Sequence, residues 1–189
     1  ELFRQNHFFN SLLLLPYSVL LAIDGFFIAD KIDFDLASPM FSLTFSWLEG
    51  NSLGQLIFGI IFLFIQAVLI NRLVISHRMS RVITLIPGLA YLLLMNALPE
   101  TRGLHQVMMA NFLAILFLLN CFPILRLYNT EKNIFNMGFW AAMSGFYFPS
   151  YFMLIILVLI AMSILRSLSL KEIGQAVTGI VTAFILVGT

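Results

Sequence analysis

The sequence predicts an all-α, polytopic membrane protein. Hydrophobic residues make up 61% of its 189 residues and charged residues only 10%, whereas a typical soluble domain has roughly 25% charged residues. The apolar residues come in stretches of about 20, the length that a helix needs to cross the hydrocarbon layer. A water-soluble fold of this size is excluded, because too few polar side chains are present to cover its surface.

Length and flanking charge divide the chain into six full spans and a seventh that is cut short. The first four predicted spans are residues 8–28, 53–75, 82–98 and 106–125. The apolar stretch 134–165 is too long for one crossing, and Pro149 interrupts it. Proline removes a helix hydrogen bond and disfavours helical geometry in the residue before it. We therefore expect a hairpin of two short spans, with a single kinked helix as the alternative, and then the start of a seventh span at 174–189.

The longest predicted connection, residues 30–52, follows the first span and carries its own apolar stretch at 40–48, with Trp47. This stretch is too short to cross the bilayer, so an interfacial or re-entrant helix at the outer leaflet is expected. Trp and Tyr gather at membrane interfaces. The residues of this kind considered interfacial are Trp47, Trp140, Tyr147 and Tyr151.

The positions of the basic residues predict the orientation, because Lys and Arg gather in short cytoplasmic loops. If Pro149 marks a hairpin, all Lys and Arg residues except Lys31 and Arg102 fall on one side of the membrane. The residues on that side are Arg4, Arg72, Arg78, Arg81, Arg126, Lys132, Arg166 and Lys171. A single kinked helix would move the last two to the other side. The N-terminus is therefore expected in the cytoplasm.

The composition also limits the function. The net charge of +1 gives no indication of a nucleic acid partner. The lone Cys121 lies in an apolar run, which excludes a disulfide within the chain. Phosphate-binding glycine loops, paired-histidine metal signatures and nucleophile elbows are absent, and no cofactor is identified. A single transmembrane domain over residues 1–189 is expected, as a fragment of a longer chain, because the sequence starts at Glu1 and stops within an apolar run.

Acidic residues on the predicted outer side are the strongest chemical candidates. Asp33 and Asp35 follow the first span, and carboxylates there can act as general bases or hold a divalent cation. The alternative is that they are simply solvated. Glu100, Arg102 and His105 lie in the next external loop as candidate substrate-binding residues. Arg102 can pair with an anion such as a lipid phosphate, or be an ordinary exposed charge.

Neutral polar and small residues within the spans predict contacts between helices. The expected hydrogen-bonding residues are Gln66, Asn96, Asn111 and Asn120. A small-residue face that allows close approach of another helix, or of a partner membrane protein, consists of Gly138, Ala141, Ala142 and Gly145. Gly174, Thr178 and Thr182 repeat this pattern in the last span at intervals of four.

Two stretches carry a resemblance to a known family. One runs from Asn71-Arg72-Leu73 through Leu85-Ile86-Pro87-Gly88 to Asn96-Ala97-Leu98-Pro99-Glu100, and the other from Phe135-Asn136-Met137-Gly138 to Phe148-Pro149. They resemble an uncharacterised family of integral membrane proteins found in Bacteroidetes, over most of the chain. The resemblance implies a multi-pass protein of the bacterial inner membrane with a longer chain, and it brings no activity.

The layout is also similar to that of the C-type glycosyltransferases, which use polyprenyl-phosphate sugars. These enzymes have an acidic residue in a long first external loop, then an interfacial helix and short-looped spans. Asp33 or Asp35 and the stretch 40–48 occupy the corresponding places. The resemblance implies that the carboxylate removes a proton from the acceptor hydroxyl while basic side chains hold the lipid phosphate. An obvious paired acidic motif is absent, and layout alone does not assign function.

Three functions therefore stay open. The first is a glycosyltransferase that acts with polyprenyl-linked sugars, and the second is a non-catalytic scaffold subunit of a larger membrane complex. The third, a transporter, ranks last because it needs broken helices near the membrane midplane, whereas Pro149 falls at a predicted surface.

Overall fold

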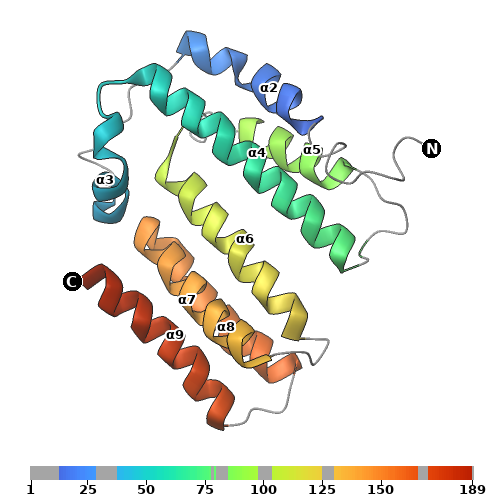
Figure 1. Cartoon of the computed structure of the whole chain (residues 1–189), viewed down its shortest axis with the longest axis vertical. Coiled ribbons are helices and arrows are strands. Elements are labelled where there is room, and N and C mark those ends of the chain that lie inside the picture. The colour runs from blue at the N-terminus through green and yellow to red at the C-terminus, as the bar shows by residue number, and fades with distance from the viewer. Residues whose placement is uncertain are drawn as a thin grey trace. The chain divides into compact units, whose positions relative to one another are not determined.

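The structure is a computed structural model that describes residues 13–28, 38–77, 79, 85–97, 104–124, 130–165 and 170–188. Every regular element in these ranges is a helix (Figure 1), which confirms the all-α class. The α-helices, with 3-10 helices written η, are α2 (Leu14–Ile28), α3 (Pro39–Phe45), η3 (Ser46–Leu48), α4 (Ser52–Ser76), α5 (Ile86–Ala97), α6 (Gln106–Ile124), α7 (Thr130–Tyr147), η5 (Pro149–Phe152), α8 (Met153–Leu165) and α9 (Leu170–Gly188).

Three segments among the described residues are long and apolar enough to cross a membrane: Ser52–Ser76, Gln106–Ile124 and Lys171–Gly188. The segments Ile86–Ala97 and Pro149–Ile160 are apolar but shorter. A helix of 12 residues such as α5 rises about 18 Å, less than the roughly 30 Å of the hydrocarbon layer. By length and composition, three described segments could therefore cross a membrane, and the number of spans stays a prediction.

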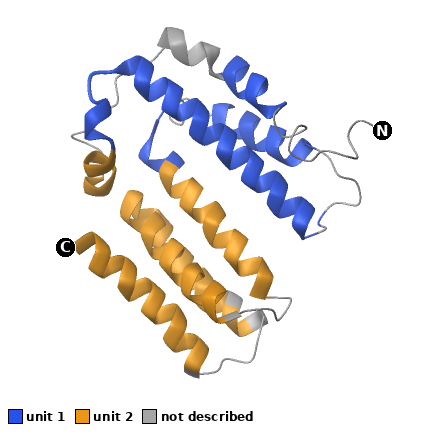
Figure 2. Ribbon diagram, in the orientation of Figure 1, with its two compact units in different colours: residues 1–36, 45–108 blue, residues 37–44, 109–189 orange. Residues whose placement is uncertain are grey.

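The chain divides into two compact units (Figure 2). Unit 1 comprises residues 1–36 and 45–108, and unit 2 comprises residues 37–44 and 109–189. The single domain expected from the sequence stays a prediction.

Unit 1 is built on α4, which packs against α2 and α5, and these two helices also pack against each other. Leu63 and Ala67 on α4 are buried. A Cβ atom on Gly88 of α5 would lie 2.9 Å from the carbonyl oxygen of Ala67. The absence of a side chain at Gly88 therefore lets the backbones of α4 and α5 approach closely.

Unit 2 contains the expected reversal of the chain at Pro149. Phe148 has extended geometry, with φ −144° and ψ 113°, as the residue before a proline prefers. Met162 near the end of α8 shares a buried cluster with Ile134 near the start of α7, while Phe152, just before α8, lies against Gly145 near the end of α7. The two helices therefore run antiparallel, and the alternative of a single kinked helix is wrong.

Small residues bring α7 and α9 into close backbone contact. A Cβ atom on Gly138 would collide with the carbonyl oxygen of Ala176, and one on Gly179 would collide with the carbonyl oxygen of Phe135. Phe184 of α9 packs edge-on against Phe146 of α7, with ring centroids 4.9 Å apart. Glu131 and Lys171 meet at the starts of the two helices and Phe146 and Phe184 meet near their ends, so α7 and α9 run parallel.

The predicted small-residue face of α7 is used within the chain. Gly138 meets α9, Gly145 lies against the ring of Phe152, and Ala141 and Ala142 are fully buried. Close helix packing at this face is therefore confirmed. Because α8, α9 and η5 belong to the same unit and cover it, the face is not open to a partner protein, as the sequence had allowed.

The face expected on the last span is not the one that packs. Ala176, Gly179 and Ala183 are the buried small residues of α9, while Gly174, Thr178 and Thr182 are exposed. Both sets have helical spacing, and spacing alone cannot show which of two small-residue faces meets a neighbour.

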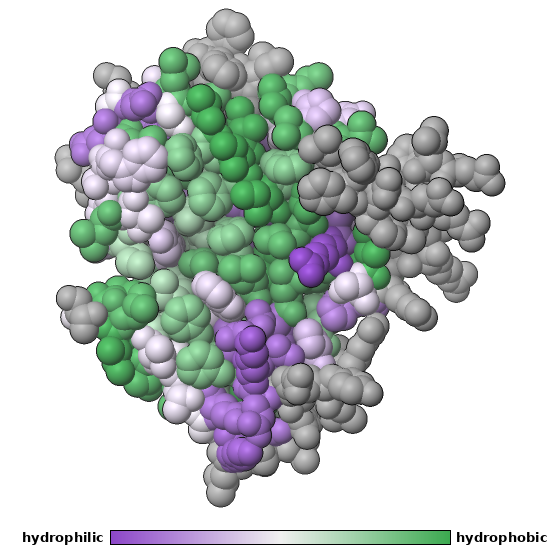
Figure 3. Space-filling view, in the orientation of Figure 1, coloured by the Kyte–Doolittle hydropathy of each residue, from purple (hydrophilic) through white to green (hydrophobic). Residues whose placement is uncertain are grey.

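Large apolar side chains are exposed on the described helices. Figure 3 shows apolar residues, in green, over much of the visible described surface. On α8 and α9 the exposed set is Met153, Ile156, Leu157, Leu159, Ile160, Val177, Val181, Phe184, Ile185 and Leu186. Such surfaces are compatible with contact to lipid and are unfavourable in water.

Candidate functional site

Only one of the predicted site residues lies within the described part of the chain. Asp33, Asp35, Glu100 and Arg102 lie outside the described residues. His105 is half-buried immediately before α6, and its backbone carbonyl accepts a hydrogen bond from the Met108 amide at 3.0 Å. Whether these five predicted residues come together stays a prediction.

The helix expected after the acidic segment is present, in two pieces. α3 and η3 together cover residues 39–48, where the sequence predicted 40–48. Phe41, Phe45 and Leu48 are buried, while Leu43 and Trp47 are exposed. The predicted short helix is therefore confirmed, with one buried and one exposed apolar face, and its place at the outer leaflet stays a prediction.

Tyrosine hydroxyls join the elements of unit 2 at one of its ends. The Thr44 Oγ1 and Tyr147 hydroxyl oxygens lie 3.1 Å apart, which links α3 to the last residue of α7. Tyr151 of η5 donates a hydrogen bond to Asn111 Oδ1 of α6. We call this group of four residues, beside the reversal at Pro149, the turn end of unit 2. Asn111 is thus confirmed as a contact between elements.

The first residues of α7 and α9 meet at the other end of unit 2. Lys171 Nζ donates to Glu131 Oε1 at 2.5 Å. Asn136 Nδ2 of α7 donates to Asn120 Oδ1 of α6 at 3.2 Å, which confirms the prediction for Asn120. We call the end that holds Glu131 and Lys171 the ion-pair end.

The ion pair has a defined pH dependence. The hydrogen bond from Lys171, and then its positive charge, lower the pKa of the Glu131 carboxyl below its usual range. A carboxyl with a lowered pKa stabilises the fold above its unfolded-state pKa, and this contribution is lost as the pH falls through the folded-state pKa. Water screens the pair, because Lys171 is 73% and Glu131 63% exposed. The pair therefore positions two helix ends and contributes little to stability.

A neutral polar network lies inside unit 1. Gln66 of α4 is fully buried. Its Nε2 donates to the Met108 carbonyl oxygen at 3.0 Å, and its Oε1 accepts a hydrogen bond from the Tyr91 hydroxyl of α5. One side chain therefore joins α4 to two other helices, as predicted. Asn96 bonds the Leu92 carbonyl oxygen of its own helix at 2.8 Å.

Asn71 is a helix contact that the sequence pattern did not reveal. It is almost fully buried on α4, and its Oδ1 accepts a hydrogen bond from the Gly88 amide at 2.8 Å. That amide is in the first turn of α5, where backbone N–H groups have no partner within the helix. Asn71 therefore caps α5 from a neighbouring helix. The sequence feature that could have indicated this role is Pro87-Gly88. Neither residue at this helix start has a polar side chain that could cap α5, so the cap has to come from elsewhere.

The amides Gln66, Asn71, Asn111 and Asn120 form hydrogen bonds between helices or elements, whereas most described serine and threonine hydroxyls bond carbonyl oxygens of their own helix. Bonds between helices orient them in an apolar environment. Within the described ranges, no three His, Cys, Asp or Glu side chains lie together in a way that could hold a metal ion.

Comparison with known proteins adds no family to this description, because no family model, curated protein or solved structure matches the chain. The resemblances to the Bacteroidetes family and to the C-type glycosyltransferases therefore stay predictions.

Proposed function

We propose that this chain is a multi-pass protein of the bacterial inner membrane that transfers a sugar from a polyprenyl-phosphate carrier at the outer membrane face. The membrane part is supported by the distribution of side chains on α4. Leu53, Ile57 and Ile61 are exposed, while Gln66 and Asn71 are buried. Water would favour the opposite arrangement. In lipid, exposed apolar side chains carry no penalty and inward polar groups bond to one another.

The proposed orientation places the ion-pair end of unit 2 in the cytoplasm. In this orientation, the reversal at Pro149 would provide the second crossing, which returns the chain to the side of Lys132. The bond between Lys171 and Glu131 is in keeping with this, because it joins the starts of α7 and α9 at one end. Under the positive-inside rule, the turn end is then external and the N-terminus cytoplasmic.

The transferase activity is supported by one observation, the place of α3. The bond between Thr44 and Tyr147 puts α3 at the turn end, which is external in the proposed orientation. The acidic segment with Asp33 and Asp35 directly precedes it. One of these carboxylates would take the proton from an acceptor hydroxyl as the hydroxyl oxygen bonds to the sugar and polyprenyl phosphate leaves.

The loop before α6 would bind the lipid carrier in this proposal. Arg102 would pair with the phosphate, since a guanidinium forms two parallel hydrogen bonds with such an anion. His105 and Glu100 would be the neighbouring binding residues.

The test of the transferase uses the double variant Asp33→Asn/Asp35→Asn. Membranes that contain the chain are given radiolabelled polyprenyl-phosphate sugar, and the release of free polyprenyl phosphate is measured. We expect release with the unaltered chain and with Glu49→Gln, an exposed carboxyl variant beside η3, and none with the double variant. Full release by the double variant would remove both aspartates from the mechanism. No release by the unaltered chain would contradict the activity itself.

A second function, a scaffold subunit, is favoured by the exposed ridge Gly174, Thr178 and Thr182 of α9. The Thr178 and Thr182 hydroxyls bond to carbonyl oxygens of their own helix at 2.8 and 2.7 Å, to Gln175 and Thr178 respectively. The ridge therefore allows close approach of another helix without burying an unsatisfied hydroxyl.

Purification in mild detergent tests the scaffold. We expect a stoichiometric membrane partner with the unaltered chain and with Val177→Leu, which enlarges an exposed neighbour of the ridge. Thr178→Leu should lose the partner, because the larger side chain blocks close approach. A chain that purifies alone and transfers sugar would contradict the scaffold.

A further inference from the structure

The connection from η3 to α4 is a rigid turn. Gly50 has φ 78°, a conformation that costs glycine little. The Asn51 side chain accepts a hydrogen bond from the Gly54 amide at 3.0 Å and so caps α4. The buried Gln55 Nε2 donates to the Leu48 carbonyl oxygen at 3.0 Å. These bonds fix η3 at the start of α4.

Trp47 is held outward on this fixed segment. Its neighbour Leu48 is 2% exposed, whereas Trp47 is 63% exposed. The indole ring packs edge-on against Phe58 of α4, with centroids 5.1 Å apart and an interplanar angle of 84°. One edge of the ring is therefore fixed against α4 and most of its surface faces away from the chain.

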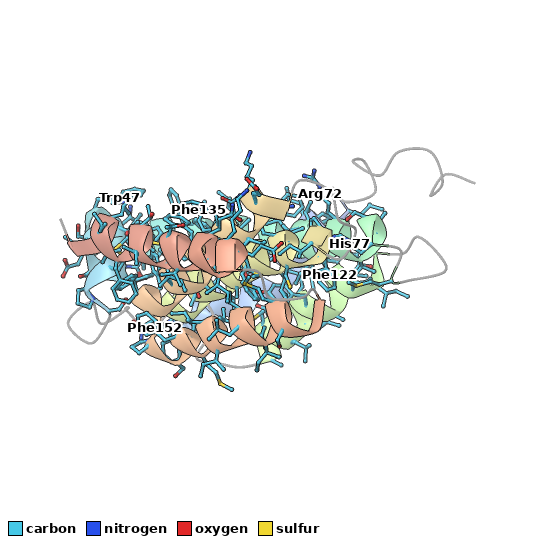
Figure 4. The ribbon with its side chains drawn as sticks, turned by 90° about the horizontal axis from the view of Figure 1, so that it is seen from below. Trp47, Arg72, His77, Phe122, Phe135 and Phe152 are labelled. Carbon is cyan, nitrogen blue, oxygen red and sulfur yellow. The ribbon has the colours of Figure 1, made fainter. Side chains whose placement is uncertain are left out.

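The polarity of the surface changes sharply at this point. Residues 49–52, Glu-Gly-Asn-Ser, are exposed and mostly polar. Beyond them α4 presents an exposed apolar stripe at intervals of four, Leu53, Ile57, Ile61 and Ile65. The next exposed charge on α4 is Arg72, about 28 Å from Leu53 along the helix at a rise of about 1.5 Å per residue. Figure 4 places Trp47 and Arg72 toward opposite ends of the helix.

A distance of about 28 Å is close to the roughly 30 Å of the hydrocarbon layer. We infer that Trp47 is an interfacial lipid anchor, whose ring lies where the acyl chains meet the headgroups of one leaflet. Trp favours this boundary, because its large ring is apolar and its N–H is polar. The polar turn 49–52 then lies among the headgroups and the α4 stripe faces the acyl chains. The inference rests on the membrane part of the proposed function and not on sugar transfer.

Fluorescence quenching by brominated lipids tests the anchor, because the chain has two tryptophans that differ in environment. Trp140 lies midway along α7 and packs against the core cluster of unit 2, so its ring is more shielded than that of Trp47, and its predicted place in an interfacial belt stays a prediction. The full chain is reconstituted in phosphatidylcholine vesicles with bromine either near the headgroups or near the bilayer centre. The variant Trp140→Phe keeps only Trp47, so its fluorescence reports Trp47 alone. Subtracting the emission of Trp47→Phe from that of the unaltered chain gives the Trp47 emission a second time.

We expect shallow bromine to quench Trp47 more strongly than deep bromine, and both to quench Trp47 more than Trp140. Aqueous iodide should quench Trp47 weakly. Stronger quenching by deep bromine would indicate a re-entrant helix and overturn the inference. Strong quenching by iodide without quenching by bromine would place Trp47 in water and also overturn it. Flotation of the same vesicles tests the membrane proposal separately. If that proposal is wrong, the chain does not float with the lipid; if only the anchor is wrong, the chain floats and the quenching pattern differs.

Discussion

At the scale of the residue, Gln66 shows how an amide side chain is accommodated in apolar helices. All of its side chain is buried, and its donor and its acceptor each meet a different helix. Buried amide groups without partners cost free energy. A side chain that satisfies both groups across two helices therefore specifies how those helices pack.

Removal of the bond between Gln66 and Tyr91 should give a measurable coupling. We expect the double-mutant cycle of Gln66→Leu and Tyr91→Phe to yield about 0.6 kcal/mol, and at most about 1.7 kcal/mol, as for other hydrogen bonds between membrane helices. Unfolding free energies in mixed micelles measure it. Ser163→Ala is the control, because this exposed hydroxyl bonds only the Ile160 carbonyl oxygen of its own helix. Additive effects of the two substitutions would contradict a direct bond.

Residue type predicted the role of Gln66, Asn111 and Asn120, because an amide in an apolar stretch has few other ways to be satisfied. It did not predict Asn71. This residue precedes Arg72 in the sequence and resembled the polar end of a span, whereas its partner is the backbone of a helix start 17 residues later. A pattern of side chains carries little information about a backbone partner. The candidate site residues before α3 and α6 other than His105 lie outside the described residues.

At the scale of the element, the two faces of α9 give a matched pair of substitutions. Gly179→Ala should destabilise unit 2 by about 1–3 kcal/mol, the usual cost of an overpacked contact, because its Cβ would collide with the Phe135 carbonyl oxygen. Gly174→Ala should be neutral or stabilising by up to about 1 kcal/mol from helix propensity, since nothing lies within 4 Å of its Cβ. The midpoint temperature at which Cys121 becomes reactive toward a thiol dye on heating measures the stability of both variants. Equal midpoints would contradict the packing of α9 on α7.

Helix positions were predicted better than helix faces. α4 and α6 begin and end within one residue of the spans expected at 53–75 and 106–125, because polar residues bound long apolar runs there. The last helix begins at Leu170 rather than at 174. Lys171 and Glu172 suggested a loop, but charged side chains are tolerated in a first turn, where Lys171 meets Glu131.

At the scale of the whole molecule, the proposed orientation takes the reversal at Pro149 as the point where the chain turns back through the membrane. The exposed Ser150 and Lys171 lie on either side of α8, and both belong to unit 2. In the proposed orientation the first is external and the second cytoplasmic.

Cysteine labelling tests this orientation. In a Cys121→Ala background, Ser150→Cys should react with an impermeant maleimide added to right-side-out membrane vesicles. Lys171→Cys should react only after the vesicles are opened with detergent, because the bilayer keeps the reagent out. The reverse pattern would invert the proposed topology. Reaction of both positions in closed vesicles would contradict a crossing by α8.

The parallel packing of α7 and α9 also constrains the order of assembly. Glu131 and Lys171 are 40 residues apart in the sequence, and α8 lies between them along the chain, so it is made before α9. During synthesis, which proceeds from the N-terminus, Gly138 of α7 lacks its contact with Ala176 until α9 has been made. The newly made hairpin is then the stage most open to insertion factors or to mispairing with a second nascent chain.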